Sequence, residues 1–490
     1  MSKRCGWLSP RQHTNHHFAE EVIPILTFQD FAKATDKAAF ISKLIQEHRQ
    51  SRAVKIARRA DKYDRQENVT ICAYVQKLFS LTGEPLVDFT ASNNKIASNF
   101  FNRLNTQRCT YSLGNGVTFT RKETRTDKDG NQVTVDLTKE QLGSRFDTDL
   151  KNGGYLALIH GVSFLFWNVD RLHVFPLTEF APLWDEETGT LRAGVRYWQL
   201  DDDHPTIAIL YEEDGYTRYR AEGDGNTNFS VAEKKRAYRQ TVSAEGADGL
   251  PEVVGEENYS GKLPIVPLYG SRLRQSTLIG MQHAIDSFDL IRSGFANDLT
   301  DCSQIYWIVE NCGGVDDADL ARFRDRLKLN HIANVDGDDA KVTPYTQEPP
   351  YQARKEYLDH IRAGIYEDFG GLDVHTVAAG ATNDHIDAAY QPMDENADDF
   401  EYQIIEAVQQ ILALIGIEDT PIFKRNRISN QKEQVEMILM EAPYLDDETI
   451  LQKMPNITPD EVTRILAAKE AEDLDRLGGE GPPEDVIDNV

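Results

Sequence analysis

Cysteine is scarce in this sequence, and the few present do not form the pairs that hold metals or disulfides. The 490 residues contain no CxxC pair, and the five cysteines are widely separated: Cys5, Cys72, Cys109, Cys302 and Cys312. This usage indicates a reducing compartment and argues against a zinc site. Long apolar runs are also lacking. No stretch is long enough to span a bilayer or has the form of a signal-peptide core, so we expect a soluble protein that stays inside the cell where it is made.

Motifs of known catalytic chemistry are missing as well. The sequence has no GxSxG or HExxH motif and no Cys/His nucleophile signature, and no GK[ST] follows its glycine-rich stretches at 113–116 and 478–481. Together these absences argue against an enzyme, and we expect no catalytic residue, no cofactor and no metal. One carboxylate group, Asp336, Asp338 and Asp339, could bind a divalent ion, but the turn in which it lies explains it without one.

Basic residues are in short supply. Lys and Arg number 53 against 80 Asp and Glu, which gives a net charge of −27. A protein that wraps DNA normally presents a net basic face, so this balance argues against that class. It leaves open a protein that encloses DNA without gripping it. The chain is also long enough for several folded parts, because single cores rarely grow past roughly 250 to 300 residues.

What the sequence does contain is an unusual order of elements between Ser276 and Ile415. From Thr277, apolar residues recur at three- and four-residue steps, which is the spacing of one helical face. These residues are Met281, Ile285, Phe288, Ile291, Phe295 and Leu299. The β-branched and aromatic run at 304–309 then predicts a strand, so the helix is expected to end before it.

A small β-α-β insert is predicted next. A short helix around 320–328 carries four basic residues: Arg322, Arg324, Arg326 and Lys328. Strands at 332–335 and 341–345 flank the turn signal at 336–339, and Pro349-Pro350 closes the insert. The basic residues alternate along the helix and so spread over more than one face. Contacts with DNA, with an acidic partner protein or with a neighbouring subunit all stay open, and we favour subunit or partner contacts.

A second helix, a loop and a long third helix complete the order. The second helix begins near Gln352 and stops at Gly370, with one apolar face formed by Leu358, Ile361, Ile365 and Phe369. Residues 372–387 are rich in Ala, Gly and Thr and have little to bury, so we expect a mobile loop. The third helix ends near Gly416 and has its apolar face at Phe400, Ile404, Val408, Ile411 and Ile415.

The first half of the chain is predicted to begin with helices. Residues 1–30 show no periodicity, residues 32–65 predict a basic amphipathic helix, and residues 93–104 predict another helix. For the basic side chains of the 32–65 helix we favour a solvated face or a subunit contact over a nucleic-acid site. These side chains are Lys43, Arg49, Arg52, Lys55, Arg58 and Arg59.

Strands are predicted for most of the chain from Tyr111 to about Pro267. The continuous apolar run at 155–167 is included among them, and Asp214-Gly215 is a strong two-residue hairpin signal. The stretch from Ala244 to Ser260 is acidic and rich in glycine, which indicates a surface loop or a disordered excursion.

The order from 276 to 415, together with several local phrases, resembles the portal proteins of tailed bacteriophages, and most closely the siphophage-type family of phages of Gram-positive hosts. Two phrases resemble the family's early helix and the start of its strands: residues 93–100 (NNKIASNF) and 113–117 (LGNGV). Two more resemble its stem helices: residues 286–298, with DSFD at their start, and residues 357–366 (YLDHIRAGIY). The likeness covers most of the chain from Asn93 to about Leu466.

The resemblance implies an α+β portal-protein fold that forms a ring, with a β-rich wing, a helical stem, a small α/β clip, a long helix and a helical crown. The implied division of the chain is an irregular segment at 1–30, the wing at 31–276, stem helices at 277–303 and 351–371, the clip at 304–350, a tunnel loop at 372–387, the long helix and its connection at 388–426, the crown at 427–476 and a disordered acidic tail at 477–490.

The same resemblance implies functional residues. The tunnel loop would meet DNA through Thr376, Val377, Ala378, Ala379, Thr382 and Asn383. The clip would contact partners or neighbouring subunits through Arg322, Arg324, Arg326 and Lys328. The stem helices would present Phe288, Phe295, Tyr357, Ile361 and Ile365.

The implied function is that of a ring, usually a dodecamer, at one capsid vertex, through which DNA is packaged and ejected. Its implied partners are double-stranded DNA, the terminase large subunit, head-completion or adaptor proteins, and the major capsid and scaffolding proteins, with no membrane. It would reside in the virion and, during assembly, in the host cytoplasm. Two alternatives remain: another head–tail connector or minor capsid protein, and a metal-dependent nuclease or terminase subunit that uses the carboxylates at 336–339.

Overall fold

The computed structural model combines helices and strands, which confirms the α+β class expected from the sequence. The chain divides into two compact units, each built from two stretches: Met1–Gly371 with Ala397–Lys424, and Leu372–Asn396 with Arg425–Val490. The structure describes residues 26–79, 85–87, 92–126, 132–222, 228–243, 252–302, 306–310, 341–345, 351–373, 383–427 and 431–454, and single positions at 318, 322, 462, 464–466, 468 and 469.

The basic segment near the N-terminus folds as separate helices: α2 (Phe28–Lys33), α3 (Lys37–Gln50), α4 (Arg52–Asp64) and α5 (Val69–Ala73). The prediction of a single helix over 32–65 is therefore wrong. The helix is interrupted between α2 and α3 and again at Ser51. This residue has extended backbone angles and its hydroxyl accepts a hydrogen bond from the Val54 N–H, so it caps a new helix. Helix α2 begins at Phe28, inside the segment expected to be irregular.

Two helices of the next region also differ from their predictions. Helix α6 is Phe100–Leu113 rather than 93–104. Residues 155–160, predicted as strand, form the end of α8 (Phe146–His160), and β6 (Val162–Asn168) begins only after Gly161. A continuous apolar run does not by itself distinguish a buried helix from a buried strand. Gly161 has φ of 91°, and a Cβ there would lie 2.8 Å from the Gln275 backbone, so a glycine separates the two elements.

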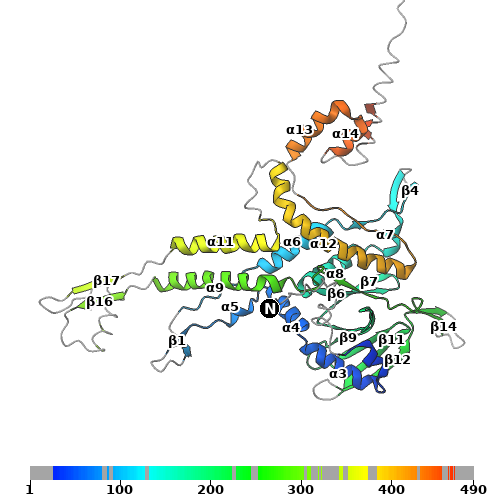
Figure 1. Ribbon diagram of the computed structural model, residues 1–490, viewed down its shortest axis with the longest axis horizontal. Helices are drawn as coiled ribbons and strands as arrows, with labels where there is room; N and C mark the ends of the chain where they lie inside the picture. The colour runs from blue at the N-terminus through cyan, green and yellow to red at the C-terminus, as the bar shows by residue number, and fades with distance from the viewer. Residues whose placement is uncertain are drawn as a thin grey trace, which may run out of the picture. The chain divides into compact units, whose positions relative to one another are not determined.

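Two antiparallel sheets form the β-rich part of the first unit (Figure 1). The five-stranded sheet has the order β12-β11-β10-β9-β8, and α3 packs on it through Ile41 and Leu44. Its strands are β8 (Phe180–Trp184), β9 (Leu191–Trp198), β10 (Ile207–Glu212), β11 (Gly215–Glu222) and β12 (Asn228–Arg236). The three-stranded sheet has the order β15-β6-β7, with β15 at Ile265–Tyr269 and β7 at Arg171–Pro176.

Smaller two-stranded pairs and one short helix complete this part of the chain. They are β1 (Lys77–Phe79) with β2 (Pro85–Val87), β4 (Lys122–Thr126) with β5 (Gln132–Asp136), β3 (Val117–Thr118) with β18 (Ile422–Phe423), and the helix α7 (Leu137–Leu142).

The hairpin predicted at Asp214-Gly215 is confirmed, with its turn shifted by one residue. Glu212 pairs with Gly215, so Glu213 and Asp214 form the turn, and Gly215 starts β11 with φ of 136°. The acidic stretch 244–260, predicted as a loop, is partly a strand. Its residues 252–257 form β14 (Glu252–Glu257), which pairs with β13 (Arg239–Ser243).

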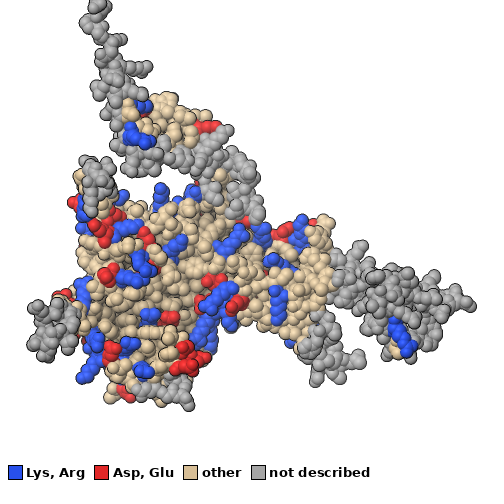
Figure 2. All heavy atoms as spheres, turned by 180° about the vertical axis from the view of Figure 1, so that it is seen from behind, with Lys and Arg blue, Asp and Glu red and all other residues tan. Residues whose placement is uncertain are grey.

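The described surface carries both positive and negative side chains, despite the net charge of −27 of the whole chain. Figure 2 shows Lys and Arg side chains lying among Asp and Glu on the face drawn there. Opposite charges that lie close together reduce the repulsion that such a net charge would otherwise produce.

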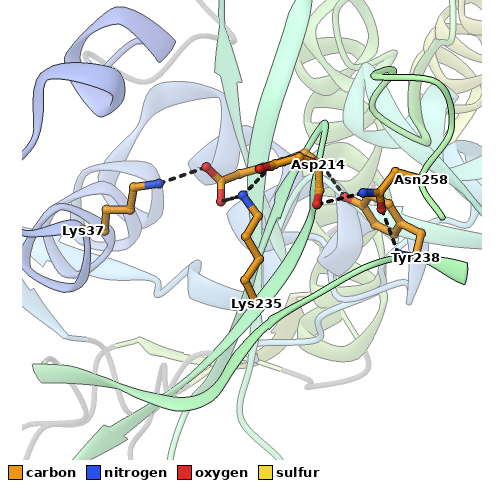
Figure 3. A network of polar contacts seen from close by, with 6 residues as sticks. Lys37, Asp214, Lys235, Tyr238 and Asn258 are labelled. Atoms are coloured by element: carbon orange, nitrogen blue, oxygen red, sulfur yellow. Dashed lines mark hydrogen bonds and ion pairs between the residues drawn. The ribbon is translucent and has the colours of Figure 1, made fainter. Parts of the chain in front are cut away.

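A network of polar contacts joins α3, the end of β10, the β10–β11 turn, β12 and two residues that follow β12 and β14, Tyr238 and Asn258 (Figure 3). Lys37 Nζ lies 3.0 Å from a carboxylate oxygen of Glu212, and Lys235 Nζ lies 2.9 Å from the other oxygen. Lys235 also pairs with Asp214. The Tyr238 hydroxyl donates to the Glu212 carbonyl at 2.6 Å, and the side-chain amide of Asn258 donates to the Asp214 carbonyl at 3.0 Å. The network holds the turn against its neighbours.

The largest core lies between the three-stranded sheet, α8 and part of α12 (Asn383–Ile415). Phe164 is fully buried, and its ring centroid lies 4.4 Å from that of Phe180. The predicted apolar face of the third helix is confirmed here, since Phe400, Ile404, Val408 and Ile411 are each 0% exposed. Residues 383–387, expected to belong to the loop, are helical and open α12.

Within the first unit, Asp419 anchors the segment that follows α12 to two threonines earlier in the chain. Its carboxylate accepts hydrogen bonds from the Thr120 hydroxyl (2.5 Å), the Thr138 hydroxyl (2.6 Å) and the Thr420 N–H (2.8 Å). Burial by itself would raise the pKa of Asp419, but these donors outweigh it and lower the pKa to about 2. Asp419 therefore stays ionised while its hydrogen bonds hold the segment after α12 against Thr120 and Thr138.

The second unit is helical in its described part. It contains α13 (Gln431–Glu441), a short 3₁₀ turn (Ala442–Tyr444) and α14 (Asp447–Lys453). Asp446 caps α14 by accepting a hydrogen bond from the Thr449 N–H at 3.1 Å. Within the same unit, Arg425 pairs with Asp394 at 3.0 Å, and Arg427 pairs with both Asp394 and Asp387.

Candidate functional site

Two long helices of the first unit, α9 (Leu278–Cys302) and α11 (Tyr351–Phe369), lie side by side and antiparallel (Figure 1). At one end of the pair, Met281 and Ile285 of α9 share an apolar cluster with Ile365 of α11. At the other end, the Phe295 and Tyr351 rings lie 5.7 Å apart. At the same end, Asp298, one turn after Phe295 in α9, forms an ion pair with Arg354, one turn after Tyr351 in α11. The two helices thus touch along most of their length.

A two-stranded antiparallel sheet lies between these helices in chain order. It consists of β16 (Tyr306–Glu310) and β17 (Lys341–Tyr345), with Ile308 opposite Thr343. The strand predicted at 341–345 is thereby confirmed, and the one predicted at 304–309 is confirmed over 306–309, while 304 and 305 lie outside the described residues. The strand predicted at 332–335 and the turn at 336–339 lie outside the described residues. Because the sheet follows α9 and precedes α11, it belongs to the end of the pair where Cys302 and Tyr351 lie.

In the half of α9 nearer to Cys302, which we call the distal half, the buried face of the helix is polar. Asp289, Ser293 and Asn297 are 0%, 2% and 6% exposed. Each accepts a hydrogen bond from the backbone of the segment 92–99. The N–H of Asn94 donates to Asn297 Oδ1 (2.6 Å), that of Ile96 to Ser293 Oγ (3.0 Å) and that of Ser98 to Asp289 Oδ1 (2.9 Å). We call this arrangement the α9 ladder.

The ladder works because two backbone repeats nearly match. Alternate residues of an extended chain are about 6.6 Å apart, and four residues of a helix advance about 6 Å. N–H groups at 94, 96 and 98 can therefore meet acceptors at 297, 293 and 289 in turn. The ladder also explains why helix α6 starts late, since residues 94, 96 and 98 give their N–H groups to α9 rather than to a helix of their own.

The proximal end of the ladder is tied to the helices α4 and α5. The side-chain amide of Asn68 donates to Asp289 Oδ2 at 2.5 Å. The hydroxyls of Tyr63 and Thr70 donate to the two oxygens of Asp286 at 2.6 and 2.7 Å. Burial raises the pKa of Asp289 above its ordinary value, although Asn68 and Ser98 donate to it. Burial, with the neighbouring Asp286, also raises the pKa of Tyr63 to about 12.

The C-terminal end of α11 is held by arginines over aromatic rings. Arg103 lies 5.9 Å from the centroid of the Tyr366 ring, and Arg108 lies 4.9 Å from that of Phe369. Burial lowers the pKa of Arg108 to about 10, against the attraction of Asp399. A cation over an aromatic face contributes about 0.5 to 2 kcal/mol, more when it is desolvated. This end of α11 is therefore firmly joined to α6.

The stem residues inferred from the sequence occupy different environments. Ile365 is 2% exposed, and Phe288 and Ile361 pack at the edge of the same apolar cluster. Phe295 contacts Tyr351 as described, whereas Tyr357 is half exposed. The continuous apolar face predicted for α9 is wrong in its distal half, where Leu299 is exposed and the ladder residues are buried in its place. The polar side chains of the ladder can be buried because they accept hydrogen bonds from the backbone of the segment 94–98.

Most of the other inferred site residues lie outside the described part of the chain. This holds for Thr376, Val377, Ala378, Ala379 and Thr382 of the loop, and for Arg324, Arg326 and Lys328 of the insert. Asn383 is the first residue of α12, so it is helical rather than part of a loop. Arg322 is exposed at a helical position.

The ladder was not foreseen from the sequence, although both of its segments were noted separately as family-like phrases. The available signal was a series of polar residues at four-residue steps, 289, 293 and 297, within a helix whose other residues follow an apolar period. Their partners are backbone groups nearly two hundred positions away, and a sequence pattern carries no mark of them.

The described residues give no sign of bound-metal chemistry or of membrane insertion. Among them, no group of three His, Cys, Asp or Glu side chains is placed to hold a metal ion. None of the helices in the described ranges is both long enough and apolar enough to cross a membrane. What the described residues of the site offer is an antiparallel helical pair with a small sheet at one end, an arrangement that can position other molecules.

The geometry is that of a structural protein, in which a mixed α/β body carries a helical pair. The chain belongs to the phage portal protein family, because the family model described as phage portal protein, SPP1 Gp6-like, matches residues 46–474. It is 24% identical to a portal protein of Clostridium phage phiCD119 over 389 residues, which cover 74% of this chain and 82% of that protein. It is 23% identical to the portal protein of Bacillus phage SPP1 over 475 residues, covering 91% and 89% of the two chains.

Proposed function

We propose that this chain is the subunit of a ring, a dodecamer, that occupies one vertex of a phage capsid and surrounds a channel for DNA. DNA enters through the channel during packaging and leaves through it at ejection. The observation that carries the proposal is the family match over residues 46–474, which spans the antiparallel pair α9–α11 and the sheet between them.

The parts of the chain take the following roles in this proposal. Helices α9 and α11 form the stem, residues 304–350 form the clip, and residues 31–276 form the wing. Residues 427–476 form the crown. The tunnel loop is limited to 372–382, because Asn383 already belongs to α12. The two-stranded sheet β16–β17 supports the assignment of the clip, since it lies between the two stem helices in chain order.

The proposed partners follow from the position of a portal ring in a capsid. The terminase large subunit docks on the clip, where Arg322 is exposed, and supplies the energy for packaging. Head-completion or adaptor proteins bind the ring afterwards, and the major capsid and scaffolding proteins surround it during assembly in the host cytoplasm. The subunit itself provides a scaffold and no catalysis.

The charge balance supports a conduit. Each Lys or Arg that neutralises a phosphate adds binding free energy that a moving duplex must then overcome. A subunit with a net charge of −27 offers few such contacts relative to its size. DNA would therefore slide through the ring with little retention.

Electron microscopy of the purified full chain tests the ring directly. Rings with a central hole are expected in negative stain, and native mass spectrometry gives the subunit number. A monomer that cleaves DNA in the presence of magnesium would refute the proposal and favour a nuclease. A closed ring that never enters a capsid vertex would instead indicate a head–tail connector.

A deletion of Ala378–Thr382 tests the tunnel loop separately. The variant is expected to form rings and procapsids as the wild type does, while DNA packaging is lost. A deletion of the same length in the acidic stretch, residues 244–248, which lie between β13 and β14 in chain order, serves as the control and should leave packaging intact. Unchanged packaging in the 378–382 variant would show that the loop is only a connector.

A further inference from the structure

Helix α4 carries an outward face of basic side chains to which the proposed channel gives no role. Arg52, Lys55, Arg59 and Lys62 are exposed. They follow one another at steps of three and four residues, so they lie on one side of the helix. Three of them, Arg52, Lys55 and Arg59, belong to the basic set noted in the sequence, for which a solvated face or a subunit contact was favoured over a nucleic-acid site.

The two carboxylates of α4 lie on its other side and have partners there. Asp61 pairs with His160 of α8, with 2.7 Å between Oδ1 and Nε2. Asp64 accepts from the Asn102 side-chain amide at 3.0 Å and from the Tyr155 hydroxyl. The negative charges of α4 are thus engaged with the body of the protein, and the positive charges face away from it.

The basic face borders a groove between α4 and the start of α9. The groove has a volume of about 470 Å³. Arg59 Nη1 donates to Gln282 Oε1 at 3.3 Å, which joins the two helices at the groove wall. The lining combines charge with apolar surface and consists of Gln50, Arg52, Lys55, Ile56, Arg59, Leu278, Ile279, Gln282 and His283.

A concave site of this kind suits an acidic peptide segment with an apolar side chain. Cations at the rim attract carboxylates, and the apolar floor of Ile56, Leu278 and Ile279 accepts a hydrocarbon group. A DNA duplex fits less well, because it needs a continuous basic track and this groove holds only a few side chains. The net charge of −27 means that other copies of the same chain supply acidic segments in abundance.

We propose that the α4–α9 groove receives an acidic segment of a second copy of this chain. The inference rests on the proposed ring. There, a head-to-tail contact in which each subunit gives its segment to the next closes after one turn and fills every groove. It assigns to the basic face of α4 the role of a contact between neighbouring subunits.

Charge reversal in the groove is the first test. The double variant Lys55→Glu and Arg59→Glu is expected to need about tenfold more protein for half-assembly than the wild type, which corresponds to about 1.4 kcal/mol per contact. Raising the salt concentration should weaken wild-type assembly in the same direction, since the pairs are screened. The matched control is Lys234→Glu, an exposed lysine on β12, which should assemble normally. Circular dichroism and a thermal melt establish that all variants fold.

Cross-linking identifies the acidic partner. Copies labelled with heavy and light nitrogen are mixed before assembly and treated with a carbodiimide, which joins a lysine amine to a carboxylate without a spacer. A Lys55 cross-link to an Asp or Glu of the other isotopic copy is expected. Reversing that residue to lysine should then restore assembly of the Lys55→Glu, Arg59→Glu variant.

Several outcomes would overturn the inference while leaving the ring in place. One is normal ring formation by the groove variant. Another is a Lys55 cross-link confined to its own copy, or no Lys55 cross-link in rings that form. A third is a variant that assembles normally but loses DNA binding, which would make the groove a nucleic-acid site. A wild-type protein that forms no ring at any concentration would refute the proposed function itself, and this contact with it.

Discussion

The β-rich part of the first unit and the α9–α11 pair are held together by different forces. In the β-rich part, aromatic and aliphatic side chains from β6, β7 and β8 fill a continuous core, with Phe164, Phe175 and Phe180 at most 2% exposed. In the distal half of α9, the most deeply buried side chains are those of Asp289, Ser293 and Asn297, and their partners are backbone N–H groups.

The two regions therefore contribute differently, one to the stability of the fold and the other to the position of a helix. Apolar packing is nondirectional and adds stability roughly in proportion to the area buried. A side-chain hydrogen bond to the backbone adds only about 1 kcal/mol net, but it demands one particular register. The core therefore supplies most of the free energy of folding, while the ladder sets where α9 lies along the segment 92–99.

The largest expected effect comes from opening the core. Phe164→Ala removes a fully buried ring and should lower the free energy of unfolding by about 3 to 5 kcal/mol. Urea denaturation measures this loss. The control Phe164→Leu keeps much of the volume and should cost less. A loss below about 1 kcal/mol in the alanine variant would mean that the core repacks, and the contrast with the ladder would disappear.

A smaller effect is expected from breaking the ladder. Asp289→Ala leaves the Ser98 N–H and the Asn68 amide buried without their acceptor, at a cost of about 1 to 3 kcal/mol. Hydrogen exchange at residues 94–98 should accelerate, while exchange in β6 and β7 stays unchanged. Asp289→Asn retains an acceptor oxygen and is the matched control. Unchanged exchange at 94–98 in the alanine variant would show that the ladder does not hold the segment.

The pH dependence of stability separates two carboxylates of opposite behaviour. The pKa of Asp289 is raised in the folded protein, so its contribution is present below the ordinary Asp pKa of about 4 and is lost as the pH rises through the folded value. The pKa of Asp419 is lowered to about 2, so its contribution is present above the ordinary value and is lost as the pH falls towards 2. Asp289→Asn and Asp419→Asn should therefore change the slope of stability against pH in opposite directions, measured by urea denaturation between pH 3 and 7. Slopes of the same sign would contradict the environments described for the two residues.

The smallest effect is expected at the exposed end of the helical pair. Arg354→Gln removes the ion pair with Asp298, whose side chains are 30% and 37% exposed, and should cost less than about 1 kcal/mol. The cost should shrink further in high salt, as measured by thermal unfolding at two salt concentrations. A loss as large as that of Asp289→Ala would show that the pair is held from this end and not by the ladder.

Local rules predicted a good part of the fold. The apolar faces of α11 and α12 follow a helical period, and the hairpin at 212–215 has the turn chemistry that predicted it. The failures share a cause. Residues 155–160 are helical although the run that contains them is mainly apolar, and 94–98 are not helical because α9 takes the N–H groups of residues 94, 96 and 98. Each outcome depends on neighbours remote in the sequence.

The sequence by itself determined the order of the described elements α9, β16, β17, α11 and α12 and, through its phrases and the family match, the family to which the chain belongs. Both depend on residues near one another in the chain, where period and turn chemistry act. Only the tertiary structure decided which polar face of α9 is buried and which face of α4 stays basic and open. These features arise between residues about 190 to 225 positions apart, such as Ser98 with Asp289 and Arg59 with Gln282, and no local pattern encodes such a match.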